Sequence, residues 1–130
     1  MPLASGLLSG RYSSSTTFAP DDHRSYNRDG SAFDVGETFA GVPWETGLDA
    51  ATEFSELVTQ LPGAPTPAQA ALAWCWQQPG VTTVIPGARN RDQAVANAEA
   101  GLLPPLGEEF LDGVRALYDG RIRELVHSRW

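Results

Sequence analysis

Hydrophobic residues recur every three to four positions over much of residues 47–130, and this spacing predicts helices. The predicted helices span residues 47 or 49 to 61, 67 to 78, 91 to 98 or 99, and 110 to 118. Between the second and the third lies the β-branched run Thr82-Thr83-Val84-Ile85, which Pro86-Gly87 ends and which predicts one strand. The pattern therefore predicts an α/β chain that is mostly helical, with about one complete strand.

The first third of the chain lacks this periodicity. Residues 13–43 are rich in Ser, Asp, Gly and Pro, which predicts a long surface loop. A loop of this length is uncommon unless it has a function. Three aromatic residues, Phe33, Phe39 and Trp44, are expected to anchor the loop, and the alternative is that they line a pocket.

The turn after the predicted strand has the features of an anion site. Asn90 and Gln93 have the N-cap and N3 spacing of a capping box, so a helix should begin close to Arg89. The first backbone N–H groups of a helix lack intrahelical partners and favour anions, and an arginine adds a planar charged fork suited to phosphate. The sequence predicts a phosphate site here. The alternative is that the cap serves geometry alone and that the arginine is only solvated.

The segment IPGARNRDQAVAN, residues 85–97, resembles the C-terminal cofactor segment of the aldo-keto reductases. These are NADPH-dependent oxidoreductases built on a (β/α)8 barrel. In several branches of that family a Glu precedes the final Asn of the motif; Ala96 stands here, so that adenosine contact is absent. The resemblance implies a grip on the adenosine 2′-phosphate of NADPH by Gly87, Arg89, Gln93 and Asn97.

The segment PLASGLLSGRY, residues 2–12, is similar to the family segment that follows the seventh barrel strand and wraps the cofactor's pyrophosphate. Its glycines let the main chain approach a ligand, and the N–H groups of such a turn can form an anion-binding concavity. The alternative is an apolar turn under a core. Arg24, in the following loop, is the candidate for a further diphosphate contact, and the alternative for it is a solvated charge. The residues that the resemblance places at the pyrophosphate are Pro2, Leu3, Ala4, Ser5, Gly6 and Arg11.

The resemblance covers essentially all 130 residues but only the last part of a family domain of roughly 300 residues. It implies the C-terminal portion of a (β/α)8 TIM barrel. Residues 1–46 would form the cofactor turn and long loop, and residues 47–130 the last helices, the strand and the C-terminal helix. A single strand cannot pair its own edges, so we expect the isolated chain to be marginally stable. It would be a fragment, a remnant, or a part that pairs with an N-terminal half-barrel.

The family's catalytic tetrad is Asp, Tyr, Lys and His, whereas all nine basic residues of this chain are Arg. Without that Lys nothing lowers the pKa of a catalytic tyrosine as the mechanism requires, so we assign no catalytic residue and expect the isolated chain to be inactive. Both histidines, His23 and His127, are expected to be solvated or capping side chains. Two functions stay open. One is the cofactor-binding part of a reductase that converts aldehydes or ketones to alcohols; the other is a non-catalytic nucleotide-binding or interaction module.

Composition and charge limit the classes of partner that the chain is expected to bind. The net charge of −7 argues against nucleic acid and anionic membranes, and no run approaches the ~20 apolar residues of a membrane span. Cys75 is the only cysteine; it lies between two tryptophans and is expected to be a small buried hydrophobe. No metal-ligand spacing or signal peptide is evident. We therefore expect a cytoplasmic protein whose partners are NADP(H) and a small carbonyl substrate.

Overall fold

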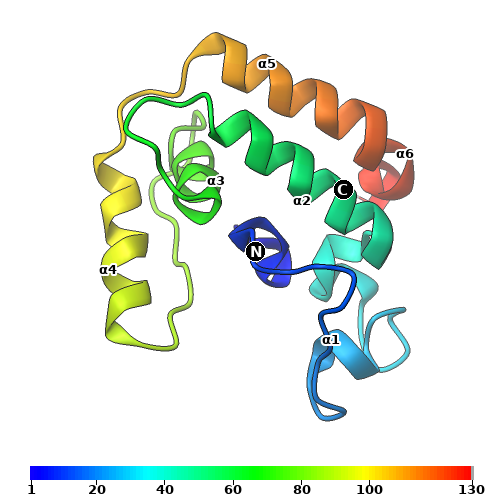
Figure 1. Cartoon of the computed structure of the whole chain (residues 1–130). Helices are drawn as coiled ribbons and strands as arrows, with labels where there is room; N and C mark the ends of the chain where they lie inside the picture. The colour runs from blue at the N-terminus through cyan, green and yellow to red at the C-terminus, as the bar shows by residue number, and fades with distance from the viewer. Residues whose placement is uncertain (130) are drawn as a thin grey trace.

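The computed structural model describes residues 1–129, and these residues are helical or irregular throughout (Figure 1). Helices α2 and α5 lie side by side and antiparallel, α3 packs beneath α2, and the N-terminal helix η1 lies at the centre of the view. The elements in chain order are η1 (Ala4–Ser9), α1 (His23–Tyr26), η2 (Val35–Glu37), η3 (Phe39–Gly41), α2 (Trp44–Val58), α3 (Pro67–Trp76), α4 (Arg91–Glu99), η4 (Ala100–Leu102), α5 (Glu108–Leu117), η5 (Tyr118–Ile122), α6 (Arg123–Val126) and η6 (His127–Arg129).

The predicted helices are present, with shifted ends. Helix α2 begins at Trp44, earlier than predicted, because Pro43 is extended and leads directly into the first turn. Helix α3 begins with a capping box: Thr66 Oγ1 accepts from Gln69 N (3.3 Å) and Gln69 Oε1 accepts from Thr66 N (3.0 Å). Helix α5 passes into the π-helix η5, which contains Gly120.

The predicted strand is not formed. Thr82 to Ile85 have no strand partner in residues 1–129, and Ile85 is 86% exposed. A strand exists only as part of a ladder, so a β-branched run without a neighbour stays irregular. The prediction of one complete strand is therefore wrong for this chain by itself.

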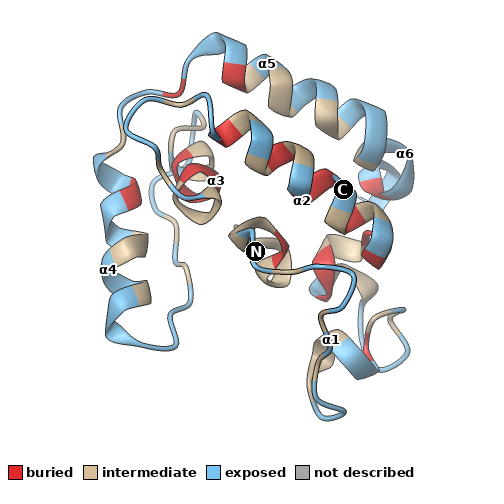
Figure 2. Ribbon diagram, in the orientation of Figure 1, coloured by how far each residue is buried: buried red, intermediate tan, exposed pale blue. Residues whose placement is uncertain are grey.

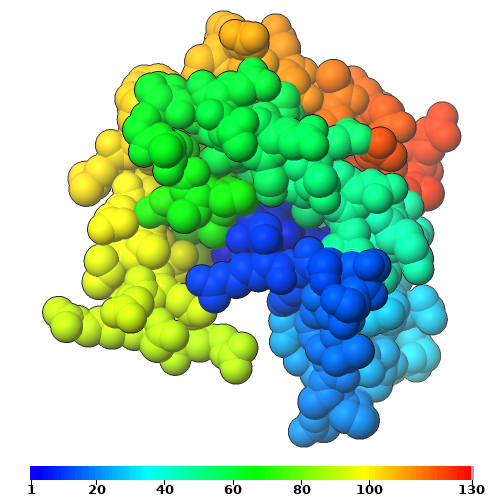
Figure 3. All heavy atoms as spheres, viewed as in Figure 1, coloured from blue at the N-terminus to red at the C-terminus, as the bar shows by residue number. Residues whose placement is uncertain are grey.

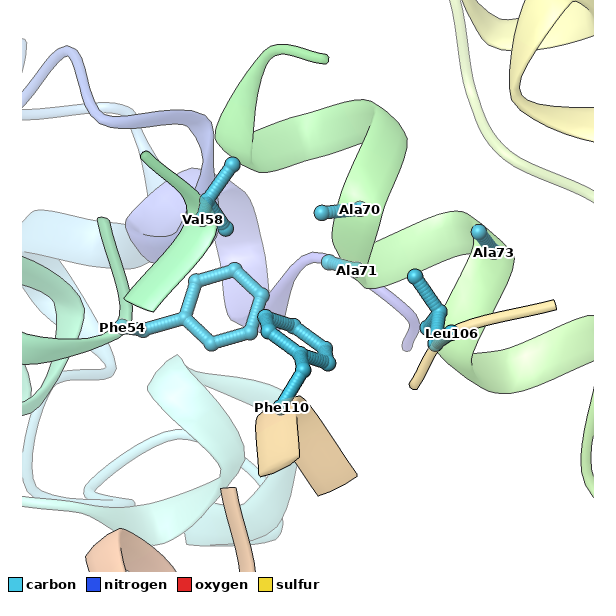
Figure 4. Packing of buried hydrophobic residues seen from close by; sticks show 7 residues of the cluster. All are labelled: Phe54, Val58, Ala70, Ala71, Ala73, Leu106 and Phe110. Atoms are coloured by element: carbon cyan, nitrogen blue, oxygen red, sulfur yellow. The ribbon is translucent and has the colours of Figure 1, made fainter. Parts of the chain in front are cut away.

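Helix α2 spans two hydrophobic clusters. In the larger cluster, Phe54 on α2 and Phe110 on α5 meet edge to face at 5.9 Å and pack on the alanine face of α3 (Figure 4). In the smaller cluster, Trp44 packs on Phe39 and on Leu7 of η1. Buried positions accordingly line the inner faces of α2, α3 and η1 (Figure 2).

The smaller cluster anchors the long loop through Phe39 and Trp44, two of the three aromatic residues that were expected to anchor it. Phe39 is 1% exposed and Trp44 is 8% exposed, whereas Phe33 lies outside the cluster, packs on the Tyr26 ring and is 42% exposed. Cys75 is only half-buried, although burial still raises the pKa of its thiol. The expectation of a small buried hydrophobe is therefore met only in part.

Candidate functional site

The second predicted cofactor segment folds into one hydrogen-bonded turn at the start of α4. Asn90 Oδ1 accepts from Gln93 N (2.9 Å), and Gln93 Oε1 accepts from Arg89 N (2.8 Å). Asn97 Nδ2 donates to Gly87 O (3.1 Å), which ties the turn to the second turn of the helix. The structure thus brings Gly87, Arg89, Gln93 and Asn97 together, with α4 beginning two residues after Arg89.

This turn leaves three features for a ligand. The N–H groups of Arg91 and Asp92 stand at the helix start, where no intrahelical acceptor exists. The Arg89 side chain is exposed and makes no hydrogen bond or ion pair within residues 1–129. A Cβ added to Gly87 would meet no atom within 4 Å, so the space over this residue is open. An arginine guanidinium and the N–H groups of a helix start are hydrogen-bond donors that suit a phosphate, and the open space gives a ligand access to them.

One detail differs from the expectation. The backbone N–H of Arg89 was expected to face an anion, but Gln93 Oε1 accepts its hydrogen bond. Gln93 and Asn97 therefore hold the turn in shape in this structure.

The first predicted cofactor segment is a left-handed turn at the start of η1. Ala4, Ser5 and Gly6 have φ values of 46°, 55° and 95°, a conformation that costs residues with a side chain roughly 1–3 kcal/mol each. Leu7 is buried and packs against Gly47 of α2, so the segment also contributes an apolar side chain to the smaller cluster. Pro2 and Leu3, just before it, are half-buried.

Ser5 joins this turn to a second left-handed run, formed by Phe39, Ala40 and Gly41. The Ser5 hydroxyl accepts from Phe39 N (3.1 Å) and donates to Glu37 O (3.4 Å). The turn and the end of the long loop therefore form one unit, in which the serine hydroxyl already has two partners.

Arg24 has a defined set of partners. Its Nε donates to Asp22 Oδ1 (2.9 Å), Nη2 pairs with Asp22 Oδ2, and Nη1 donates to the Tyr12 hydroxyl. The guanidinium lies 4.5 Å from the centre of the Phe18 ring. This pairing holds the pKa of Asp22 well below its usual range and raises that of Arg24. The expectation of a solvated charge is wrong, and Arg24 lies beside the η1 turn because Tyr12 Oη also donates to Ser5 O (3.2 Å).

Arg11 is the remaining predicted contact. Its side chain is exposed, and within residues 1–129 it makes no hydrogen bond or ion pair. The structure does not join it to Arg24 or to the η1 turn.

The two predicted cofactor segments lie on either side of α3, which packs against both η1 and α4. Figure 3 shows an open notch between the arm around residues 81–92 and the N-terminal part of the chain. No hydrogen bond joins the two segments within residues 1–129.

Two polar arrangements were missed from the sequence. One is the Tyr12 hydroxyl, although Tyr12 belongs to the first predicted cofactor segment. The other is an exposed pair near the C-terminus, in which Tyr118 Oη and His127 Nδ1 lie 2.9 Å apart and Arg123 faces the other ring nitrogen. His23 lies 3.5 Å from Asp22 Oδ1 and is partly exposed.

Among residues 1–129, no group of His, Cys, Asp and Glu side chains is placed to hold a metal ion. None of the helices in that range has the length and hydropathy that crossing a membrane requires.

Comparisons with known proteins identify the family of the chain. The family model of the aldo/keto reductase family matches residues 1–119, and the chain belongs to this family, whose fold is the TIM barrel. A protein of Schizosaccharomyces pombe described as “Putative voltage-gated potassium channel subunit beta” is 36% identical over 126 residues, which cover 97% of this chain and 32% of the relative. One of Oryza sativa subsp. japonica described as “Probable voltage-gated potassium channel subunit beta” is 34% identical over 125 residues, covering 92% of this chain and 34% of the relative. The chain therefore spans about a third of the length of these relatives.

Proposed function

We propose that this chain is the cofactor-gripping part of an NADPH-dependent reductase of aldehydes or ketones. The observation that carries the proposal is the turn from Gly87 to Asn97, where the exposed Arg89 side chain has no partner within residues 1–129, lies two residues before the start of α4, and has open space at Gly87. When bound, the cofactor supplies a hydride. The chain's own residues bind and orient its adenosine and diphosphate ends.

The 2′-phosphate assignment rests on charge. The chain carries a net charge of −7, so an anion needs a local positive spot. Arg89 provides that spot without an internal carboxylate partner in the described residues. A guanidinium binds a phosphate through charge-assisted hydrogen bonds, which a ribose hydroxyl cannot match.

The diphosphate assignment rests on the η1 turn. Ala4, Ser5 and Gly6 present a tightly bent main chain, and Arg24 is held beside it. The exposed Arg11 is the second cation proposed for this end. Because the chain has no Lys, the tetrad would come from an N-terminal half-barrel that completes the sheet.

Titration of NADPH against the chain, followed by nicotinamide fluorescence, tests the 2′-phosphate assignment. Arg89→Ala is expected to weaken binding about tenfold or more, since it removes hydrogen bonds between two charged groups. Arg115→Ala, which removes an exposed arginine on α5, is the matched control and should leave the affinity unchanged. An Arg89→Ala protein that binds NADPH as tightly as the Arg115→Ala protein would contradict the assignment.

A second candidate is a nucleotide-binding module without chemistry. The absence of Lys favours it, and the two relatives are described as channel subunits rather than as reductases. Carbonyl-dependent oxidation of NADPH by the chain combined with its N-terminal half-barrel separates the two candidates. Turnover favours the reductase, whereas NADPH binding without turnover favours the module.

A further inference from the structure

The Tyr12 hydroxyl joins the η1 turn to Arg24. It donates to Ser5 O (3.2 Å) and accepts from Arg24 Nη1. It also fills the space over Gly6, where a Cβ would lie 2.5 Å from it. The tyrosine ring is fixed by Phe18, at 5.3 Å edge to face, and by Trp44, at 5.9 Å. The position of this hydroxyl is therefore set by the smaller hydrophobic cluster.

The Arg24 guanidinium has more N–H donors than its partners in the described residues use. A guanidinium has five N–H donors, and the contacts with Asp22 and Tyr12 use three of them. One N–H on each terminal nitrogen has no partner within residues 1–129. Two donors on neighbouring nitrogens match two oxygens of a phosphate, and their directions depend on what holds the guanidinium.

We propose that Tyr12 is a positioning residue of the diphosphate grip, which orients the Arg24 guanidinium beside the Ser5–Gly6 turn. The inference rests on the proposed function, because the ligand it orients Arg24 toward is the diphosphate of NADPH. Asp22 pairs with Nε and Nη2 and Tyr12 pairs with Nη1, so all three nitrogens of the guanidinium are held in place. Without the hydroxyl, Arg24 keeps Asp22 and the Phe18 ring, but its hydrogen-bonded link to the Ser5–Gly6 turn is lost.

Tyr12→Phe tests this role because it keeps the ring packing and removes only the hydroxyl. Tyr26→Phe is the matched control: it makes the same change in the same loop, at an exposed tyrosine whose hydroxyl has no hydrogen bond within residues 1–129. Two probes are titrated against each variant, namely NADPH, which carries the diphosphate, and adenosine 2′-monophosphate, which carries only the 2′-phosphate. Tyr12→Phe should weaken NADPH binding about fivefold to tenfold and leave adenosine 2′-monophosphate binding unchanged. Tyr26→Phe should change neither.

A double-substitution cycle separates positioning from a general loss of structure. Arg24→Gln leaves the Tyr12–Ser5 bond in place and should weaken NADPH binding in the unchanged chain, but much less in the Tyr12→Phe background. Unchanged NADPH affinity in Tyr12→Phe, equal losses for both probes, or additive losses with Arg24→Gln would overturn the proposal. If the unchanged chain binds neither probe, the proposed function itself fails, and the positioning role fails with it.

Discussion

Two glycines of the cofactor segments differ in what surrounds them. Gly6 has a φ of 95°, and a Cβ there would collide with the Tyr12 hydroxyl, so backbone conformation and packing both require glycine. Gly87 has no positive φ and no atom within 4 Å of an added Cβ. Within residues 1–129 the folded chain therefore makes no demand for glycine at position 87, and a side chain added there would project into the open space beside Arg89.

This contrast predicts that replacing glycine by alanine lowers the stability of the chain at position 6 but not at position 87. Gly6→Ala should lower the free energy of unfolding by about 1–3 kcal/mol, because it adds strain and displaces Tyr12. Gly87→Ala should leave the unfolding free energy within about 0.5 kcal/mol of the unchanged chain and weaken NADPH binding. Urea denaturation together with NADPH titration of both variants is the measurement. A destabilised Gly87→Ala protein, or a stable Gly6→Ala protein, would show that the turn geometry is misassigned.

The ion pair of Asp22 and Arg24 should make stability depend on pH. Because the folded pKa of Asp22 lies below its unfolded value, the pair stabilises the chain above the ordinary Asp pKa of about 3.9. This contribution is lost as the pH falls from that value toward the folded pKa. Asp22→Asn keeps an oxygen to cap α1 but removes the charge, so it should cost about 1 kcal/mol at pH 7 and less near pH 2.

Denaturation midpoints of the Asp22→Asn protein measured between pH 7 and pH 2 check this dependence. Asp21→Asn makes the same charge change one residue away, at an exposed carboxylate without an ion pair in the described residues, and should have no such effect. A constant difference between the Asp22→Asn protein and the unchanged chain over the whole range would contradict the role of the pair.

At the scale of elements, the sequence predicted the helix starts, which depend on neighbouring residues, but not the state of the expected strand, which depends on a distant partner. The capping box at Thr66 and the N-cap at Asn90 were readable from the sequence because each involves residues no more than three positions apart. The reciprocal half of the box predicted at Asn90 is not formed, because Gln93 Oε1 accepts from Arg89 N instead of Asn90 N. The run from Thr82 to Ile85 has strand composition, but strand formation depends on a neighbour that residues 1–129 do not supply. The link from Tyr12 to Ser5 and Arg24 was also unreadable, since it depends on how the long loop folds back.

Hydrogen exchange should show the difference between these elements. The N–H groups of Thr82, Thr83, Val84 and Ile85 have no hydrogen-bond acceptor within residues 1–129. They should exchange at rates close to those of an unstructured peptide, whereas the central N–H groups of α2 should be protected. Protection of residues 82–85 in the monomeric chain would mean that the segment pairs in a way the structure does not show.

At the scale of the molecule, stability depends on two clusters connected through α2. The exposed segment around Ile85 adds apolar surface that nothing covers in the described residues. A small core with uncovered apolar surface gives a marginal folded state. We therefore expect thermal unfolding of the monomer to be broad, with helix content and tryptophan fluorescence changing at different temperatures. A single sharp transition seen by both probes would contradict this expectation.

The central claim is that the turn at Gly87 to Asn97 grips the 2′-phosphate of NADPH. The most direct test is to titrate NADPH and NADH against the unchanged chain under the same conditions and compare the two dissociation constants. The two cofactors differ only in that phosphate, so an exposed Arg89 at the helix start should make NADPH bind about tenfold tighter or more. Added salt should narrow the difference. Equal affinities for NADPH and NADH would contradict the account.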